Sequence, residues 1–407
     1  MSELNPVFRG TYTYGLTEQR MIKRNPLINL IETLIICPFK SLMYSGSSFL
    51  RDKYIDKERV IRAKAQLDAI GADSIKLKTP DGALLDAKYL KASYFRLQLE
   101  KYFNVVEVME NGLPHQKLLV KEEFCKKIEK KLTLGTDCSY LQPNPEVEAF
   151  VQVLKGLGMG VFSNGIISQE NNLRGVVIEL GHVPKNLPLV TAETKSTVLI
   201  APGADMSYAA YKSLAAAYLL RGMNVLLVDF RGYGESEGSP TSHKTKLDLE
   251  TAYQYLREKK HIENNDLVVH GHCMGGGSAT DLAARRTGVN LILDRSFSDY
   301  RDVAKNRFPL ISEIIYRILP WIINYNNAEN LAKIVGHIAI AMANEDAVIS
   351  KEQTMNQIDS LPNTKPGQVV KLIDTAGGHS GIWTENAITS DQFNQFLTQT
   401  HLRGRLF

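Results

Sequence analysis

The chain has 407 residues, of which 44% are hydrophobic and 23% charged, a composition typical of a soluble globular protein rather than a disordered one. Its formal net charge of +4 is too small to indicate a nucleic-acid partner, which usually requires a strongly basic patch. The four cysteines (Cys37, Cys125, Cys138 and Cys273) include no pair with Cys-x-x-Cys spacing. We therefore expect free thiols in a reducing compartment and no bound metal.

Residues 1–70 are predicted to form a helical extension. Within it, residues 27–37 space their apolar side chains as an amphipathic helix does, but the run is too short to span a bilayer. Such a face either makes peripheral membrane contact or packs on the body of the protein, and the moderately basic flanks favour packing. No signal peptide or transmembrane run is visible, so we expect a cytoplasmic protein.

Residues 71–92 contain two short β runs around Pro80-Asp81-Gly82, the composition of a hairpin corner. Residues 91–190 are predicted to be a mixed α and β insertion. Its expected strands cover residues 104–109 and 175–180, and its expected helices cover residues 122–132 and 146–157. The glycines of residues 156–160 follow a helical pattern and so indicate a turn rather than a phosphate-binding loop, and we expect no cofactor.

From residue 195 to residue 407 the pattern becomes regular, with short apolar strands alternating with helices of ten or more residues. The expected strands are 197–201, 225–229, 266–270, 291–294, 338–342 and 369–373, and the expected helices include 209–221, 246–259 and 274–286. This alternation predicts an α/β fold with a mostly parallel sheet covered by helices on both faces. The early hairpin would add the antiparallel edge of that sheet.

The run from His270 to Gly276, His-Gly-His-Cys-Met-Gly-Gly, follows an apolar strand directly and opens a helix. This is the strand–turn–helix context of a nucleophile elbow, here Gly-x-Cys-x-Gly instead of the usual Gly-x-Ser-x-Gly. Small neighbours let the strand and helix approach closely, and the helix N-terminus stabilises negative charge. Cys273 is therefore the candidate nucleophile. Taken alone, it would more simply be a buried structural thiol.

Two later strands supply an acid and a base in the order that this chemistry requires. Strand 338–342 leads to Asp346, and strand 369–373 leads through a Gly-Gly turn to His379. His379 would take the thiol proton and later activate water, while Asp346 would orient the imidazole. Glu345 and Asp294 are alternative acids. The oxyanion hole would use the backbone N–H groups of Met274, after the nucleophile, and of Ala204, after the first parallel strand.

These motifs resemble a known family. Asp229-Phe-Arg-Gly-Tyr-Gly-Glu-Ser-Glu-Gly-Ser-Pro240 is similar to the D-[FY]-R-G-[YF]-G-x-S-x-G-x-P segment of α/β-hydrolases, in particular the branch of serine aminopeptidase-like hydrolases and acyl-protein thioesterases (depalmitoylases). Residues 79–86 and 291–300 resemble further segments of that branch. The resemblance covers residues 70–92 and 195–400 and implies the α/β-hydrolase fold. Cysteine replaces the family's serine, as in dienelactone hydrolases, and Pro202 stands where many members have histidine.

The sequence leaves the substrate open. An apolar helix over residues 308–325 is predicted either to pack in the core or to form a lid that binds a hydrophobic acyl group. The favoured hypothesis is an esterase or thioesterase acting on a small-molecule or lipidated-protein acyl substrate. The alternatives are a weak or inactive hydrolase-fold scaffold that binds partners through its N-terminal half, and a peptidase or amidase. Hydrolase cores with such extensions also resemble exported bacterial effectors, which makes export a further hypothesis.

Overall fold

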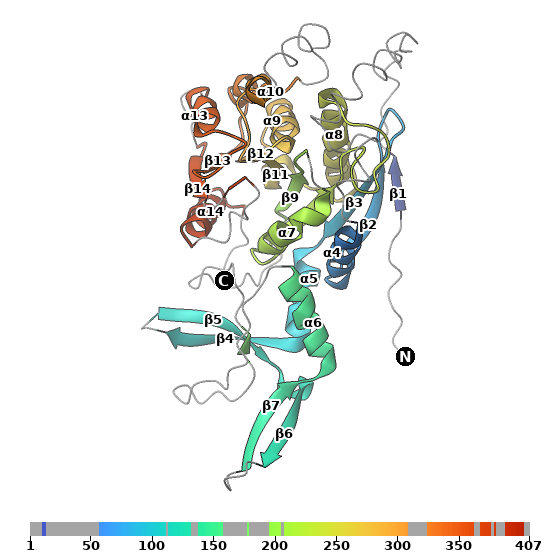
Figure 1. Ribbon diagram of the computed structural model, residues 1–407, viewed down its shortest axis with the longest axis vertical. Helices are drawn as coiled ribbons and strands as arrows, with labels where there is room; N and C mark the ends of the chain where they lie inside the picture. The colour runs from blue at the N-terminus through green and yellow to red at the C-terminus, as the bar shows by residue number, and fades with distance from the viewer. Residues whose placement is uncertain are drawn as a thin grey trace.

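The structure, a computed structural model, describes residues 10–13, 57–110, 113–131, 137–157, 177–178, 195–204, 207–307, 324–361, 367–375, 378–379 and 387–402. In this part of the chain one sheet of nine strands forms the main body (Figure 1), in the order β1-β2-β3-β10-β9-β11-β12-β13-β14. The strands are β1 (Gly10–Thr13), β2 (Asp73–Lys78), β3 (Leu84–Leu90), β9 (Thr197–Ala201), β10 (Asn224–Val228), β11 (Leu267–His272), β12 (Asn290–Asp294), β13 (Ile338–Ala343) and β14 (Val370–Thr375). Only β3 runs antiparallel to its neighbours.

Alternate residues of the parallel strands face two separate hydrophobic cores. In β9, Leu199 belongs to the core beneath α8 (Ser242–Lys259) and α9 (Gly275–Arg285), whereas Val198 and Ile200 belong to the core on the opposite face. The second core is covered by α7 (Lys212–Leu219) and α14 (Ala387–Gln399). Because both faces of the central strands β9, β10, β11, β12 and β13 are buried, most of their residues are apolar. The predicted α/β architecture with helices on both faces is confirmed.

Further helices are α4 (Lys57–Ala69), α10 (Tyr300–Arg307), α12 (Asn327–Leu331) and α13 (Lys351–Asp359), with 3₁₀ turns η4 (Tyr208–Tyr211) and η5 (Asn264–Asp266). No helix in the described ranges is long and apolar enough to cross a bilayer.

The segment after the hairpin adds two helices and two small sheets. The helices are α5 (Ala92–Tyr102) and α6 (Pro145–Gly156), and the strands are β4 (Phe103–Glu110), β5 (Leu113–Val120), β6 (Cys125–Lys131), β7 (Asp137–Pro143) and β8 (Val177–Ile178). The sheets β4-β5-β8 and β6-β7 lie beyond α5 and α6, away from the main sheet. Asn144 caps α6 by accepting the N–H of Val147, and Pro145 occupies the first turn, where its missing N–H costs nothing.

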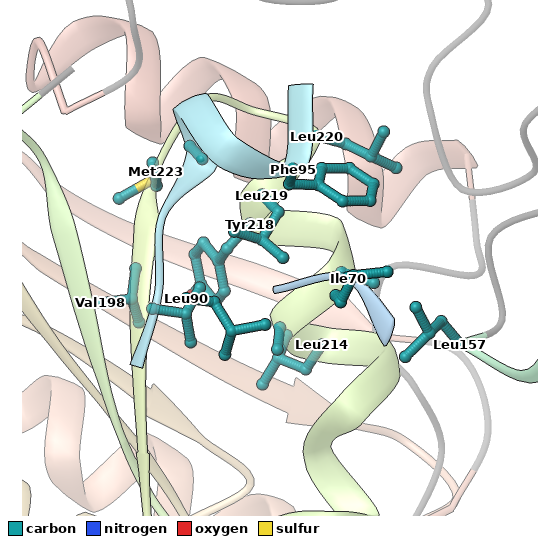
Figure 2. Close-up of a cluster of buried hydrophobic side chains, with 14 of the residues drawn as sticks. Ile70, Leu90, Phe95, Leu157, Val198, Leu214, Tyr218, Leu219, Leu220 and Met223 are labelled. Carbon is teal, nitrogen blue, oxygen red and sulfur yellow. The ribbon is translucent and has the colours of Figure 1, made fainter. Parts of the chain in front are cut away.

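The added helices share a core with the main body. Figure 2 shows Phe95 of α5 and Leu157, which follows α6, gathered with Leu214 and Tyr218 of α7 and with Val198 of β9. All of these side chains are buried. The segment is therefore held by hydrophobic packing and not only by its covalent connections.

One prediction is wrong, and a second is confirmed only in part, since helix α4 (Lys57–Ala69) lies within the extension predicted to be helical. Residues 122–132, expected to be a helix, form a short 3₁₀ turn, η2 (Glu122–Phe124), followed by strand β6. Strand β6 pairs with β7 in register from Cys125↔Pro143 to Lys131↔Asp137, and this pairing overrides the helix propensity of a Lys- and Glu-rich run. The extension expected to be helical over residues 1–70 includes strand β1, whose threonines and tyrosine suit a strand and which pairs with β2. The amphipathic run 27–37 and residues 308–323 of the expected lid lie outside the described residues.

Candidate active site

Cys273 lies at the tip of the turn between β11 and α9. Its φ of 49° is left-handed, a backbone conformation that costs a residue with a side chain of order 1 kcal/mol or more. Hydrogen bonds on both sides hold it there: the Cys273 N–H donates to the carbonyl of Asp294 at 3.0 Å, and the Cys273 carbonyl accepts from the N–H of Gly276 at 3.0 Å and from the Ser296 hydroxyl at 2.8 Å. The surrounding structure thus imposes the strained conformation and leaves the thiol partly exposed.

Glycines make this turn sterically feasible. A Cβ on Gly271, at the end of β11, would lie 2.6 Å from the Cα of Gly276. A Cβ on Gly275 would lie 2.1 Å from the carbonyl oxygen of Ala201, at the end of β9. The helix can therefore approach both strands only because these positions lack side chains.

Asp346 and His379 meet above the ends of β13 and β14. The Asp346 Oδ1 accepts from the N–H groups of Val348 and Ile349, both at 2.8 Å, and its Oδ2 lies 2.8 Å from the His379 Nδ1. Burial on its own raises the pKa of Asp346, but the hydrogen bond with His379 and the two backbone donors lower it below its ordinary value. The neighbouring Glu345 is exposed.

His379 also lies near Cys273, close enough for the thiol to affect the pKa of the ring. Burial on its own lowers the pKa of His379, but hydrogen bonds with Asp346 and Cys273, together with their charges, raise the pKa to about 10. The imidazole is therefore flanked by a thiol on one side and a carboxylate on the other, and this arrangement favours its charged form. The structure brings together all three residues that the sequence suggested as a triad.

The turn after β9 lies against the elbow. A Cβ on Gly203 would be 3.4 Å from the Cβ of Cys273, so the turn that contains Gly203 and Ala204 passes close to the elbow. The Gly203 N–H donates to the Tyr211 hydroxyl at 2.8 Å, so this N–H is already engaged. Met274, the other expected donor, stands at the N-cap of α9 with its side chain fully buried.

Sequence reasoning missed several buried polar residues beside these three. Asp294, considered as an alternative acid, accepts from the Arg295 guanidinium at 2.7 and 3.0 Å and does not contact His379. Arg295 has a φ of 47° and donates from Nη1 to the carbonyl of Gly378 at 3.1 Å. His270 and His272 are the polar residues of an otherwise apolar strand. That interruption was the available signal, because a buried polar side chain needs a partner.

A comparison with families of known proteins bears on the fold. The family model described as "Serine aminopeptidase, S33" matches residues 192–357. By fold, the chain is an α/β-hydrolase.

Parts of this chain are similar in sequence to parts of known proteins. Protein bem46 of Schizosaccharomyces pombe is 36% identical over 102 residues, which are 25% of this chain and 34% of the relative. The lysophosphatidylserine lipase ABHD12 of Danio rerio is 30% identical over 164 residues, 36% of this chain and 41% of the relative. The match therefore spans less than half of either protein. The solved structure of the Pyrococcus furiosus esterase Pf2001 superimposes with a TM-score of 0.48 and 14% identity, covering 82% of this chain and 94% of the esterase.

Proposed function

We propose that this α/β-hydrolase cleaves carboxylic ester or thioester bonds of an acyl substrate through a Cys-His-Asp triad and an acyl-enzyme intermediate. The observation that carries the proposal is the chain of contacts from Cys273, at its strained turn, to His379 and from His379 to Asp346. Strained backbone at an accessible nucleophile and a base oriented by a third group are the features of covalent catalysis. Lipase is also the activity that the name of the Danio rerio relative states, which favours a fatty-acyl group.

Before the first step the Cys273 thiol gives its proton to His379. The thiolate sulfur then attacks the carbonyl carbon of the substrate and forms a C–S bond. The carbonyl electron pair moves to the oxygen, which accepts hydrogen bonds from the backbone N–H groups of Met274 and Ala204. As the tetrahedral intermediate collapses, the bond to the leaving group breaks, and the leaving oxygen or sulfur takes the proton held by His379. The raised pKa of His379 supports this role, because the ring carries a proton before attack.

The second step hydrolyses the thioester on Cys273. His379, now neutral, takes a proton from water while the water oxygen attacks the acyl carbon, and collapse breaks the C–S bond. The carboxylic acid leaves, and the sulfur and His379 return to their starting protonation. Asp346 holds the Nδ1–H of the ring through both steps, which directs Nε2 to the reacting atoms.

The experiment is a burst assay with a p-nitrophenyl ester and a matched thioester over a range of acyl lengths. We expect a burst of product equal to the enzyme concentration, and mass spectrometry should find one acyl group on Cys273. Cys273→Ala should show neither the product burst nor the bound acyl group. Cys125→Ala is the matched control, because burial and the charge of Glu122 raise the pKa of the Cys125 thiol and keep it protonated.

A burst that survives in Cys273→Ala would contradict the proposal. If wild type and Cys273→Ala are equally inert with every ester and thioester, the scaffold hypothesis becomes the better account. Cleavage of amide substrates in preference to esters would favour the peptidase alternative.

A further inference from the structure

Two tyrosine–histidine pairs lie side by side under the elbow. His270 and His272 are two residues apart in β11 and so point to the same face of the sheet, where each meets a tyrosine. The Tyr218 hydroxyl lies 2.7 Å from the Nδ1 of His270, and the Tyr211 hydroxyl lies 2.9 Å from the Nδ1 of His272. All four side chains are buried. The pairs are alike in chemistry but differ in what lies beyond them.

The pair formed by Tyr211 and His272 continues in both directions to the candidate site. The Tyr211 oxygen accepts the N–H of Gly203, in the oxyanion turn, at 2.8 Å. The Nε2 of His272 lies 3.1 Å from the backbone carbonyl oxygen of His379. The neighbouring carbonyl, that of Gly378, accepts from Arg295. Two consecutive carbonyls of the histidine loop are thus each held by a buried side chain.

The direction of each hydrogen bond in this series from Gly203 to His379 is fixed. The carbonyl of His379 can only accept, so the proton of the His272 ring is on Nε2. Burial lowers the pKa of His272 to about 4, so the ring is neutral and its Nδ1 is an acceptor. Burial raises the pKa of Tyr211 well above its usual range, so the phenol keeps its proton and donates to Nδ1. Each group in the series therefore donates to the next. The Gly203 N–H donates to the Tyr211 oxygen, the Tyr211 hydroxyl to the His272 Nδ1, and the His272 Nε2–H to the His379 carbonyl.

We propose that His272 and Tyr211 are positioning residues that fix the oxyanion turn and the histidine loop relative to the adjacent Cys273. This inference rests on the proposed function, since it assigns the pair a task at that same site. His272 is not itself a reacting group, although its ring packs against that of His379 with centroids 5.2 Å apart. It acts through the backbone of His379, which sets where the catalytic imidazole stands, and through Tyr211, which sets where the turn containing Ala204 stands. The pair of Tyr218 and His270 is less direct. The Nε2 of His270 lies 3.4 Å from the Oδ2 of Asp294, and this pair reaches the Gly378 carbonyl through Asp294 and Arg295.

The matched variants are Tyr211→Phe and Tyr218→Phe. Each removes one buried hydroxyl from a histidine Nδ1, so we expect similar falls in thermal stability. Tyr211→Phe should lower kcat on the order of tenfold with little change in KM, and more than Tyr218→Phe does, because a displacement of about 1 Å in a catalytic group costs up to about a hundredfold. His272→Gln keeps an N–H donor for the His379 carbonyl and should retain more activity than His272→Leu. These two His272 variants test the same inference if Tyr211→Phe does not fold.

A readout without substrate separates this inference from the proposed function. Alkylation of Cys273 by iodoacetamide should depend on where the His379 ring lies, so the pH profile of alkylation should change more in Tyr211→Phe than in Tyr218→Phe. A wild type that hydrolyses no ester but shows this difference would refute the proposed function and support the positioning role. Identical alkylation profiles and identical kcat in the two tyrosine variants, or equal activity of His272→Gln and His272→Leu, would overturn the positioning role.

Discussion

Replacing Asp346 by asparagine should destabilise the protein in a way that depends on pH. The wild-type carboxylate lies 2.8 Å from the His379 Nδ1 and contributes to raising the pKa of that ring to about 10. Asparagine has nearly the same shape but carries no charge. Its single oxygen can accept the Nδ1–H, but the NH2 group then faces the N–H groups of Val348 and Ile349, and this second loss does not depend on pH. The pKa of His379 should therefore fall toward its ordinary value of 6.5.

The size of the effect follows from the pKa change. A rise of the His379 pKa from 6.5 to about 10 corresponds to about 5 kcal/mol of stabilisation at about 1.4 kcal/mol per pH unit. Cys273 and Asp346 both contribute to this rise. A hydrogen bond between charged groups contributes about 1.5–3 kcal/mol, so we assign about 2 kcal/mol to Asp346. Because the folded-state pKa is raised, this stabilisation is fully present below about pH 6.5 and is lost as the pH rises toward about 10.

The opposite sign applies to the carboxylate itself. Its pKa is lowered in the folded state, so its stabilisation is present above pH 3.8 and is lost as the pH falls through the lowered value. Equilibrium urea unfolding of wild type and Asp346→Asn at about pH 6 and about pH 9 should show a difference that shrinks at the higher pH. Glu345→Gln, which alters the exposed neighbour, should match wild type at both. A wild-type advantage of equal size at the two pH values would refute the ion pair.

Three further changes test other parts of the structure. Gly275→Ala places a methyl carbon 2.1 Å from the Ala201 carbonyl oxygen and should cost roughly 3 kcal/mol, measured by urea unfolding, since neither backbone can move away without repacking. Asp248→Asn removes one of the two charge partners of the buried Arg231, the one bound at 2.5 and 2.8 Å, and should lower the unfolding free energy by about 3 kcal/mol. A loss below about 1 kcal/mol would show that Asp81, the other partner, suffices. Mild peroxide should abolish the acylation burst and a reductant should restore it, because a reactive Cys273 oxidises first to a reversible sulfenic acid; activity that persists in peroxide would contradict an activated thiol.

Local sequence patterns predicted much of the fold. The apolar strands of the main sheet are buried on both faces, so their composition alone indicated a parallel sheet between helices. The same logic pointed to Cys273, Asp346 and His379, because each follows a strand and the carboxyl ends of parallel strands meet at one edge. Their catalytic roles stay a prediction, but the contacts that those roles require are present.

Other features depend on partners that are distant in the chain. The run Cys125–Lys131 has a composition that suits a helix and becomes a strand only because β7 pairs with it. His272 and His379 are 107 residues apart, and nothing near either one indicates that the imidazole of the first holds the backbone of the second. Sequence by itself determined what the short-range physics of burial and turns controls, namely the sheet, its helices and the positions of the candidate triad. The tertiary structure decided which buried polar groups satisfy one another, because a hydrogen bond depends on the distance between atoms and not on the number of residues between them.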